Sequence, residues 1–355
     1  MRLAILAPGN SIHTIKWVNA LANRGHQVHL LTMHKSVEDL HENIAEHLLQ
    51  FPSPAGYYLN VFLLRRLLNR LMPDFLHAHY ASGYGTLARL SRYKPLLLSV
   101  WGSDVYDFPE ESCLNKYILR KNLASADCIS STSHCMKIQT EKYMKHKLPI
   151  EVIPFGVNTE VFCPQPNRDI DKITIGMVKK MAPQYGPKFL MEAFDIINKK
   201  YPNSRLILIG GGPQEEELKR LAHNLGIAEY CNFVGSVFHR EVPRWLNQFD
   251  IYCAPSTMES FGVAVIEASA CGLPVIVSRV GGLPEVVQEN KTGIIIPPKD
   301  VNALVQALET LIKNKELRIS MGNAGRIYVQ QHYEWEFCVD KMEQLYYQAM
   351  ESYDR

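Results

Sequence analysis

One segment, residues 251–272, constrains the fold of this chain more than any other. It opens with a short apolar run typical of a buried strand, and it closes with an apolar stretch that stops at Gly272, as a helix does. The loop between them contains Ser260 and Gly262. A helix entered through small residues presents unpaired backbone N–H groups and the positive end of its dipole to an anion. The segment therefore predicts a strand, a phosphate-binding loop and a helix.

Two carboxylates flank the predicted anion site. Glu267 lies five residues beyond Gly262, which is roughly 7 to 8 Å along a helix axis and about the reach from a diphosphate to a ribose. Glu259 lies on the other side, in the loop. Carboxylates accept hydrogen bonds from both hydroxyls of a diol. The order therefore fits ribose, diphosphate and sugar, although a solvated loop charge and an ordinary helix-face glutamate are the alternative interpretation.

The surrounding residues resemble a known donor-site motif. The two glutamates stand in the pattern P-S-x-x-E-S-F-G-V-x-x-I-E-A, followed by Gly281-Gly282. This pattern is similar to the Glu-x7-Glu signature of family 4 of the retaining glycosyltransferases, which have the GT-B fold. The resemblance implies that Glu259 contacts the transferred sugar and Glu267 the ribose. It also implies that backbone amides bind the diphosphate, those of Ser260, Phe261, Gly262 and Val263.

The length and the pattern of apolar runs predict two α/β domains. A chain of 355 residues is long for one hydrophobic core. In the first half, predicted strands alternate with predicted helices, which is typical of a parallel sheet with helices on its faces. The strands fall at 3–7, 28–32, 75–79, 96–101 and 127–131, and the helices near 12–23, 59–71, 83–93, 111–124 and 133–145.

The resemblance implies how these domains divide. It predicts an acceptor-binding Rossmann-like domain at 1–163 and a nucleotide-sugar donor domain at 164–332, the two facing across a cleft. It also predicts a C-terminal helix at 333–355 that crosses back to the first domain.

The loop after the first strand contains Gly9 and Asn10. It lacks the Gly-x-Gly-x-x-Gly pattern, and no acidic residue closes the second strand, so a dinucleotide fold of the oxidoreductase kind is not indicated. The resemblance implies instead that this loop lies under the cleft, where Gly9 and Asn10 contact donor phosphates.

Candidate catalytic groups follow two other strands. His77 and His79 are two apart, so they share one face of a strand, and strand ends are where open parallel sheets bind ligands. Relatives carry His-Gly where this chain has Trp101-Gly102, and an indole cannot accept a proton. The role of general base therefore falls to His79 or Asp104, and the alternative for Asp104 is a helix cap.

The second half supplies cations and a base-binding region. The resemblance implies that Lys179 or Lys180 neutralises the diphosphate, with Tyr185 standing where relatives carry a second cation. It also implies that the nucleotide base rests near Gly235 and Val237. Asp169-Ile170-Asp171 matches the Asp-x-Asp of metal-dependent transferases but stands in a linker, so no metal site is expected and no cofactor is predicted.

Charge and hydropathy bear on partners and location. The net charge is +2, which argues against a dedicated nucleic-acid binder. Residues 1–165 hold 17 Lys+Arg against 13 Asp+Glu, an excess of four positive charges. The basic amphipathic pattern at 59–71 and the lysines at 137–147 fit peripheral contact with an anionic membrane, although a solvated helix face is the alternative. No apolar run approaches a membrane span, so we expect a cytoplasmic protein, at the inner face of the membrane if this contact exists.

The sequence thus predicts a retaining, metal-independent hexosyltransferase. It would move a hexose or N-acetylhexosamine from a nucleotide-diphosphate sugar, by expectation a UDP-sugar, to a glycan or lipid-linked acceptor in cell-surface polysaccharide or glycolipid synthesis. Two alternatives stay open. One is a nucleotide-sugar epimerase of GT-B fold, and the other is a non-catalytic nucleotide-sugar or glycan-binding protein.

Overall fold

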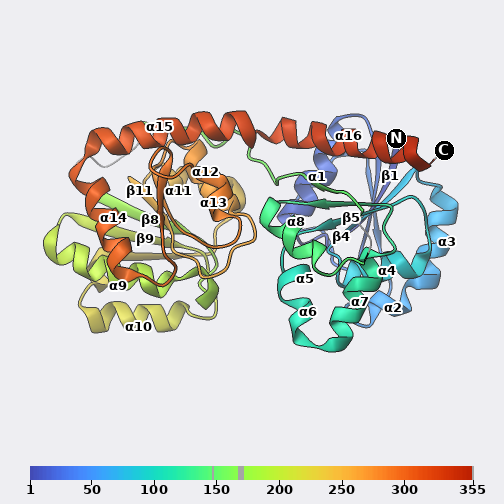
Figure 1. Ribbon diagram of the computed structural model, residues 1–355, viewed down its shortest axis with the longest axis horizontal. Helices are drawn as coiled ribbons and strands as arrows, with labels where there is room; N and C mark the ends of the chain where they lie inside the picture. Colours follow the sequence, from blue (N-terminus) through green and yellow to red (C-terminus); the bar gives the residue numbers. More distant parts are fainter. Residues whose placement is uncertain (146–147, 167–171, 354–355) are drawn as a thin grey trace. The chain divides into compact units, whose positions relative to one another are not determined.

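A computed structural model describes residues 1–145, 148–166 and 172–353 of the chain. The chain forms two compact units. The first unit contains Met1–Phe155 and Cys338–Arg355, and the second contains Gly156–Phe337. Both units are α/β, as the alternation of apolar runs and helical patterns predicts (Figure 1).

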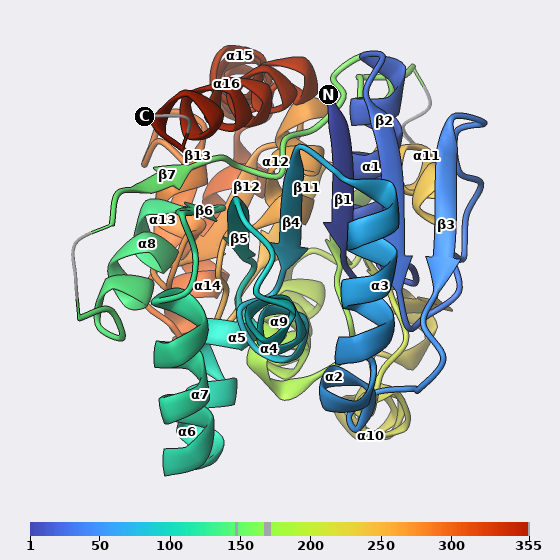
Figure 2. The same ribbon diagram turned by 90° about the vertical axis from the view of Figure 1, so that its right-hand side faces the viewer.

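The first unit is built on a parallel sheet of seven strands in the order β3-β2-β1-β4-β5-β6-β7. Figure 2 shows this order across the sheet, from β3 at one edge to β7 at the other. The strands are β1 Arg2–Leu6, β2 Gln27–Thr32, β3 Ile44–Leu48, β4 Phe75–His79, β5 Leu96–Val100, β6 Cys128–Ser131 and β7 Ile150–Val152.

Helices cover the sheet of the first unit and close its core. They are α1 Ile12–Asn23, α2 Gly56–Leu59, α3 Val61–Leu71, α4 Gly83–Ser91, α5 Ser103–Tyr106, α6 Phe108–Glu111, α7 Cys113–Leu123 and α8 His134–Glu141. The last helix, α16 Trp335–Tyr353, contributes its residues from Cys338 onward to this unit. Leu64 and Leu68 of α3 and Leu87 of α4 are fully or almost fully buried in a core with the strand residues Leu76 and Leu98.

Two details of the first unit differ from the sequence prediction. The predicted helix at 59–71 is broken at Asn60, because this buried side chain bonds the backbone of Phe51 in both directions, at 2.8 Å and 3.1 Å. Strands β3 and β7 were not predicted. Both are edge strands. The residues of β3 are half-buried or exposed, and β7 has three residues of which one is exposed, so neither carries a continuous apolar run.

The second unit is built on a parallel sheet of six strands in the order β10-β9-β8-β11-β12-β13. These strands are β8 Ile173–Val178, β9 Ser204–Ile209, β10 Cys231–Gly235, β11 Ile251–Ala254, β12 Val275–Ser278 and β13 Gly293–Ile296. Its helices are α9 Pro187–Lys200, α10 Glu215–Leu225, α11 Val242–Leu246, α12 Val263–Ala270, α13 Leu283–Val286, α14 Val301–Lys313 and α15 Lys315–His332, with short 3-10 turns η1 Pro183–Tyr185, η2 Ala228–Tyr230 and η3 His239–Glu241.

The strand order of each unit contains one point where the chain changes direction across the sheet. In the second unit the chain runs outward from β8 to β10 and then returns to place β11 on the other side of β8. In the first unit the same reversal lies between β1 and β4. In open parallel sheets the carboxyl ends of the strands at such a point form the ligand-binding edge. The topology therefore points to the loops that follow β8 and β11, and those that follow β1 and β4.

Candidate functional site

Two segments meet where the strand order of the second unit reverses, between β8 and β11. Strand β8 is followed by Lys179 and the turn η1, and β11 is followed by the loop at 255–262. Three hydrogen bonds fasten these loops together, because Gln184 O accepts the N–H groups of Thr257 and Met258, at 2.8 Å and 3.2 Å, and the Thr257 hydroxyl at 3.3 Å. The predicted anion-binding loop is therefore held against the end of β8.

Helix α12 begins where the sequence predicts it. Gly262 is its N-cap, with a φ of 110° that a side chain rarely adopts, and Val263 is its first residue. The first hydrogen bond at this end is donated by Val265 N–H to Gly262 O at 3.0 Å. The N–H groups of Val263 and Ala264 precede that bond, so they are directed out of the helix end as an anion site requires.

Glu259 and Lys179 form an ion pair in front of this helix. Lys179 Nζ lies 2.7 Å from Glu259 Oε2, and the two side chains are 18% and 9% exposed. Oε2 accepts no hydrogen bond from the described residues, so the contact is a charge pair without hydrogen-bond alignment. The ammonium also lies 4.8 Å from the ring centre of Tyr185, a cation–π contact. Lys180 is exposed. Of the two candidate lysines, only Lys179 is held in the site.

Glu267 has a partner that the sequence did not predict. His239 Nε2 lies 2.7 Å from Glu267 Oε1, and the carboxylate side chain is only 5% exposed. The imidazole comes from η3 and lies 5.4 Å from the ring of Phe162. A carboxylate has two oxygens, and His239 contacts only Oε1. Contact of Glu267 with a ribose stays a prediction.

Close backbone packing positions the loop that carries Glu259. Gly282 N–H donates to Glu259 O at 3.0 Å. A Cβ on Gly281 would overlap Glu259 O, and a Cβ on Gly282 would overlap the backbone at Ser260 and Phe261. Close packing within the second unit therefore explains why glycine stands at both positions, 281 and 282.

The predicted base-binding region lies at the end of β10. Gly235 ends this strand with a φ of 78°, and its carbonyl accepts the Gly210 N–H at 2.8 Å. Gly211 N–H in turn donates to Ser236 Oγ at 3.1 Å. Val237 is half-buried and lies two residues before His239. The same loop thus carries the predicted base contacts and the partner of the predicted ribose carboxylate.

In the first unit, the loop after β1 has the close packing expected of a glycine loop. Gly9 is buried, its N–H donates to Thr32 Oγ1 at 2.9 Å, and a Cβ there would overlap His34 O. Asn10 is exposed. Contact of either residue with donor phosphates stays a prediction.

Asp104 is tied to the backbone around it. Its Oδ2 accepts Ala81 N–H at 2.7 Å, and Oδ1 accepts the N–H groups of Trp101 and Gly102 at 3.1 Å and 2.8 Å. Burial raises the pKa of this carboxyl, while the backbone hydrogen bonds oppose that rise. Both oxygens are thus engaged, which supports a structural role in the turn after β5.

His79 lies in an aromatic cluster at the end of β4. Its ring is 4.2 Å from that of Trp101 and 4.5 Å from that of His77. Burial, with a smaller contribution from His77, holds the pKa of His79 well below its usual range, and its Nδ1 has no partner among the described residues. Burial therefore favours the neutral imidazole and makes His79 a weak base, and its side chain is almost fully buried.

His77 makes a different set of contacts. Its Nδ1 lies 2.6 Å from the Tyr346 hydroxyl and its Nε2 lies 2.6 Å from Ser99 Oγ. Burial lowers its pKa to about 3. With both ring nitrogens engaged, His77 connects β4 to β5 and to α16 within the first unit.

The described residues form neither a metal-binding cluster nor a membrane-spanning helix. Within the described residues, no group of three or more His, Cys, Asp or Glu side chains is arranged to hold a metal ion. No helix of the described chain has the length and hydropathy needed to span a membrane. The Asp169-Ile170-Asp171 match lies outside the described residues.

Comparison with known proteins identifies the two domains. Residues 2–133 match the family described as glycosyl transferase 4-like, and residues 159–328 match the family described as glycosyl transferases group 1.

Curated relatives give the same class of protein. The GDP-mannose-dependent alpha-(1-6)-phosphatidylinositol monomannoside mannosyltransferase of Mycobacterium tuberculosis (strain CDC 1551 / Oshkosh) is 29% identical over 63% of this chain and 63% of its own. The chain thus spans a little less than two thirds of that relative's length. The N-acetyl-alpha-D-glucosaminyl L-malate synthase of Bacillus anthracis is 25% identical over 93% of this chain and 91% of its own.

A solved structure gives the fold. The sucrose-phosphate synthase of Thermosynechococcus elongatus superposes with a TM-score of 0.88 at 22% identity, covering 99% of this chain and 100% of its own. The predicted α/β architecture of GT-B type is confirmed. The chain therefore has the GT-B fold, and it contains a region that matches the glycosyl transferase 4-like family followed by one that matches the glycosyl transferases group 1 family.

Proposed function

We propose that this protein transfers a hexose or N-acetylhexosamine from a nucleotide-diphosphate sugar to a hydroxyl of a glycan or lipid-linked acceptor, with retention at the anomeric carbon. The observation that carries the proposal is the arrangement around α12. A helix end with outward N–H groups lies between two largely buried carboxylates, Glu259 and Glu267, and each carboxylate is paired with a basic side chain, Lys179 or His239.

In this arrangement the diphosphate binds at the N-terminus of α12. The amides of Ser260, Phe261, Gly262 and Val263 approach its oxygens, and the helix dipole stabilises their charge. Glu267 accepts the ribose hydroxyls and Glu259 those of the sugar. The chemistry at each position matches the group that is placed there, because carboxylates recognise diols and amides recognise phosphates.

Lys179 stabilises the leaving group. When the sugar departs, negative charge develops on the diphosphate, and a cation already held in the site stabilises that charge without reorganisation. The chain's own cation and helix end thus supply the charge that a divalent metal supplies elsewhere, so we propose that transfer is metal-independent. Unchanged turnover in excess EDTA is the expected result, and a turnover that depends on added Mg²⁺ or Mn²⁺ would contradict it.

Retention follows if the acceptor hydroxyl attacks from the face that the nucleotide leaves. No side-chain nucleophile is then needed, and the leaving diphosphate itself accepts the acceptor's proton. This course fits the contacts of the two predicted bases within the first unit, because Asp104 is engaged by three backbone N–H groups and His79 is almost fully buried.

The donor is proposed to be a UDP-sugar, with a GDP-sugar as the competing choice. A GDP-sugar is the competing choice because the name of the Mycobacterium tuberculosis relative specifies GDP-mannose. Titration of UDP-glucose, UDP-N-acetylglucosamine, GDP-mannose and ADP-glucose into the protein, followed by NMR of the product's anomeric proton, tests both donor and retention. Inversion of the anomeric configuration in the product would contradict the retaining mechanism.

Peripheral membrane contact is proposed for the surface formed by α2 and α3. Tyr58, Leu59 and Phe62 are 53%, 54% and 82% exposed beside the exposed Arg66 and Arg70. Such a surface suits an interface of anionic lipid. Co-sedimentation with phosphatidylglycerol vesicles should fall when Phe62 and Arg66 are replaced by Ser and Gln. Equal sedimentation of the variant and the wild type would show that α3 does not contact the membrane.

A further inference from the structure

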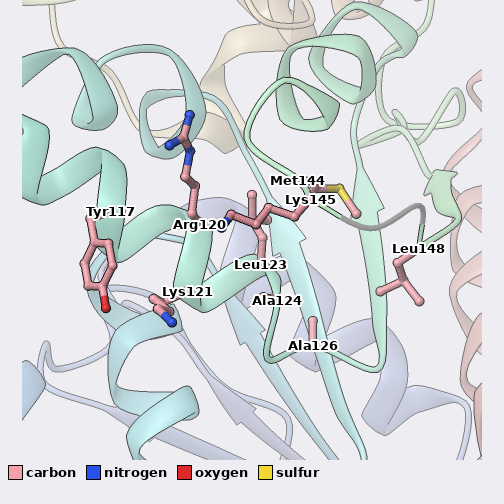
Figure 3. A pocket seen from close by; sticks show the side chains of 9 residues that line it. All are labelled: Tyr117, Arg120, Lys121, Leu123, Ala124, Ala126, Met144, Lys145 and Leu148. Atoms are coloured by element: carbon pink, nitrogen blue, oxygen red, sulfur yellow. The ribbon is translucent and has the colours of Figure 1, made fainter.

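A cavity lies in the first unit. It has a volume of about 510 Å³, which is within the range of small-molecule sites. Figure 3 shows Tyr117 and Lys121 of α7 on one side of it and Leu148 on the other. Its lining residues are Tyr117, Arg120, Lys121, Leu123, Ala124, Ala126, Met144, Lys145 and Leu148.

The cavity lies at the amino ends of the strands, whereas the predicted catalytic residue His79 lies at a carboxyl end. Ala126 lies two residues before β6 and Leu148 lies two residues before β7, so both mark the amino ends of their strands. His79 and Trp101 stand at the carboxyl ends of β4 and β5. Since the sheet is parallel, these two edges are separated by the length of its strands. No predicted site residue lines the cavity.

Its lining combines an apolar floor with a cationic rim. Leu123 is buried at the floor, and Met144 and Leu148 are half-buried. Arg120, Lys121 and Lys145 are exposed at the rim, and no carboxylate lines the cavity.

The cations at the rim are available to a ligand. Among the described residues, none of the three forms an ion pair with a carboxylate. The neighbouring carboxylate, Asp127, is already engaged by Lys94 Nζ at 2.6 Å and by Leu96 N–H at 2.7 Å. Lys121 Nζ lies 5.4 Å from the ring centre of Tyr117, which brings those two lining side chains together.

The cations are also not needed to cap α7. Arg120 O accepts the Ala124 N–H at 3.1 Å, and Asn122 O accepts the Ser125 N–H at 3.0 Å and the Ser125 hydroxyl at 2.7 Å. The last carbonyl groups of the helix are therefore satisfied by the turn that follows it. Capping hydrogen bonds at the helix end therefore do not account for these charges.

We propose that this cavity binds an anionic amphiphile, a phosphate or carboxylate head on a hydrocarbon chain, as a site separate from the transferase centre. The head lies at the rim and forms charge-assisted hydrogen bonds with Arg120, Lys121 and Lys145. The chain lies on Leu123, Met144 and Leu148, where it buries apolar surface. An inorganic anion would leave the floor exposed, and a neutral hydrocarbon would leave the cations without a partner.

Three soluble probes separate the contributions of head and chain. They are a phosphatidate with two six-carbon chains, the phosphatidylcholine of the same chain length, and glycerol phosphate, each titrated into the whole chain by calorimetry below its micelle concentration. The phosphatidate should bind at least about tenfold more tightly than either control. Equal affinity for glycerol phosphate would show that the hydrocarbon chain contributes nothing and that the cavity binds only free phosphate. Equal affinity for the phosphatidylcholine would show that the cations contribute nothing to binding.

Matched variants test whether the phosphatidate binds in this cavity. Arg120→Ala with Lys121→Ala should weaken phosphatidate at least about tenfold, whereas Lys116→Ala with Lys142→Ala should leave it unchanged. The control pair removes the same charge from the same unit, but neither residue lines the cavity. Arg120→Lys with Lys121→Arg keeps both charges and should retain binding even if the alanine pair folds poorly. Equal loss in the control pair, or equal binding by the alanine pair, would overturn the proposal.

Discussion

Lys179 and Lys180 are adjacent in sequence but differ in their contacts. Lys179 lies 2.7 Å from Glu259 and 4.8 Å from the ring centre of Tyr185, whereas Lys180 is exposed. Loss of one group that stabilises developing negative charge typically costs about 2.7 to 4 kcal/mol of barrier. Lys179→Ala should therefore lower kcat by about 100-fold or more in a donor-saturated transfer assay.

Lys180→Ala is the matched control, because it removes the same charge from the next position. Its kcat should stay within about twofold of the wild type, since surface charges outside a site contribute little. An equal loss of kcat in both variants would show that any positive charge in this region has the same effect and that the contacts of Lys179 do not matter.

His239 should act on the donor through Glu267. The imidazole lies 2.7 Å from the carboxylate that is proposed to hold the ribose, so His239→Ala should raise the Kd for a nucleoside diphosphate by about tenfold. For the 2′,3′-dideoxy analogue, which lacks the hydroxyls that Glu267 would accept, the same substitution should change Kd by less than about twofold.

That comparison separates orientation of Glu267 from general damage to the fold. A penalty of equal size for both nucleotides would show that His239 only supports the structure. His239→Gln keeps a donor at this position and should recover part of the ribonucleotide affinity.

The sequence could predict the carboxylates of this site but not their partners. Glu259 and Glu267 stand in one continuous motif, so local spacing around Gly262 was sufficient to find them. His239 lies 28 residues from Glu267 in sequence, and only the turn η3 brings its ring to the carboxylate. A tertiary contact of this kind leaves no periodic pattern in the chain.

At the scale of elements, the prediction succeeded where burial is continuous. Helix α1 has the predicted bounds of 12–23, and strand β4 has those of 75–79. Edge strand β3 was missed because one of its long sides has no neighbouring strand, and its residues are half-buried or exposed. The break at Asn60 was missed because it depends on hydrogen bonds to Phe51 rather than on the apolar pattern.

The contacts of β4 predict a pH-dependent stability. Burial lowers the pKa of His77 to about 3 from an ordinary value of 6.5. Between these values the unfolded chain binds a proton at His77 and the folded chain does not, so the free energy of unfolding falls as the pH drops below 6.5. For this group, going from about pH 7.5 to about pH 5.5 should cost about 1.4 kcal/mol.

Urea denaturation at both pH values measures this cost, and His77→Gln supplies the control. The variant should be less stable at neutral pH, but its loss on acidification should be smaller by about 1.4 kcal/mol. Parallel losses in the two proteins would mean that His77 is not the titrating group.

At the scale of the whole molecule, the end of the chain is part of the first unit. Cys338–Arg355 groups with Met1–Phe155, and Arg24 pairs with Asp340 and Glu343 at 2.6 Å and 2.8 Å. Tyr346 is fully buried and bonds His77. The last helix thus contributes both charge pairs and core to a sheet formed more than 180 residues earlier in the sequence.

Tyr346→Phe tests that contribution with the smallest change. It keeps the ring but removes the hydroxyl, so His77 Nδ1 loses its partner inside the core. An unsatisfied buried polar group costs about 1 to 3 kcal/mol, and the free energy of unfolding should fall by that amount. Tyr347→Phe is the control, since Tyr347 is 53% exposed, and it should leave the stability unchanged within about 0.5 kcal/mol. Equal stability of the two variants would show that the contact contributes nothing.

The proposed function requires that the end of α12 binds a nucleotide-diphosphate sugar between Glu259 and Glu267. Calorimetric titration of the preferred nucleotide-sugar into the wild type and into the variant Glu259→Gln with Glu267→Gln measures this binding. Glutamine keeps the size of each side chain but loses its charge, so Kd should rise by about 100-fold or more. An unchanged Kd in the double variant would contradict it.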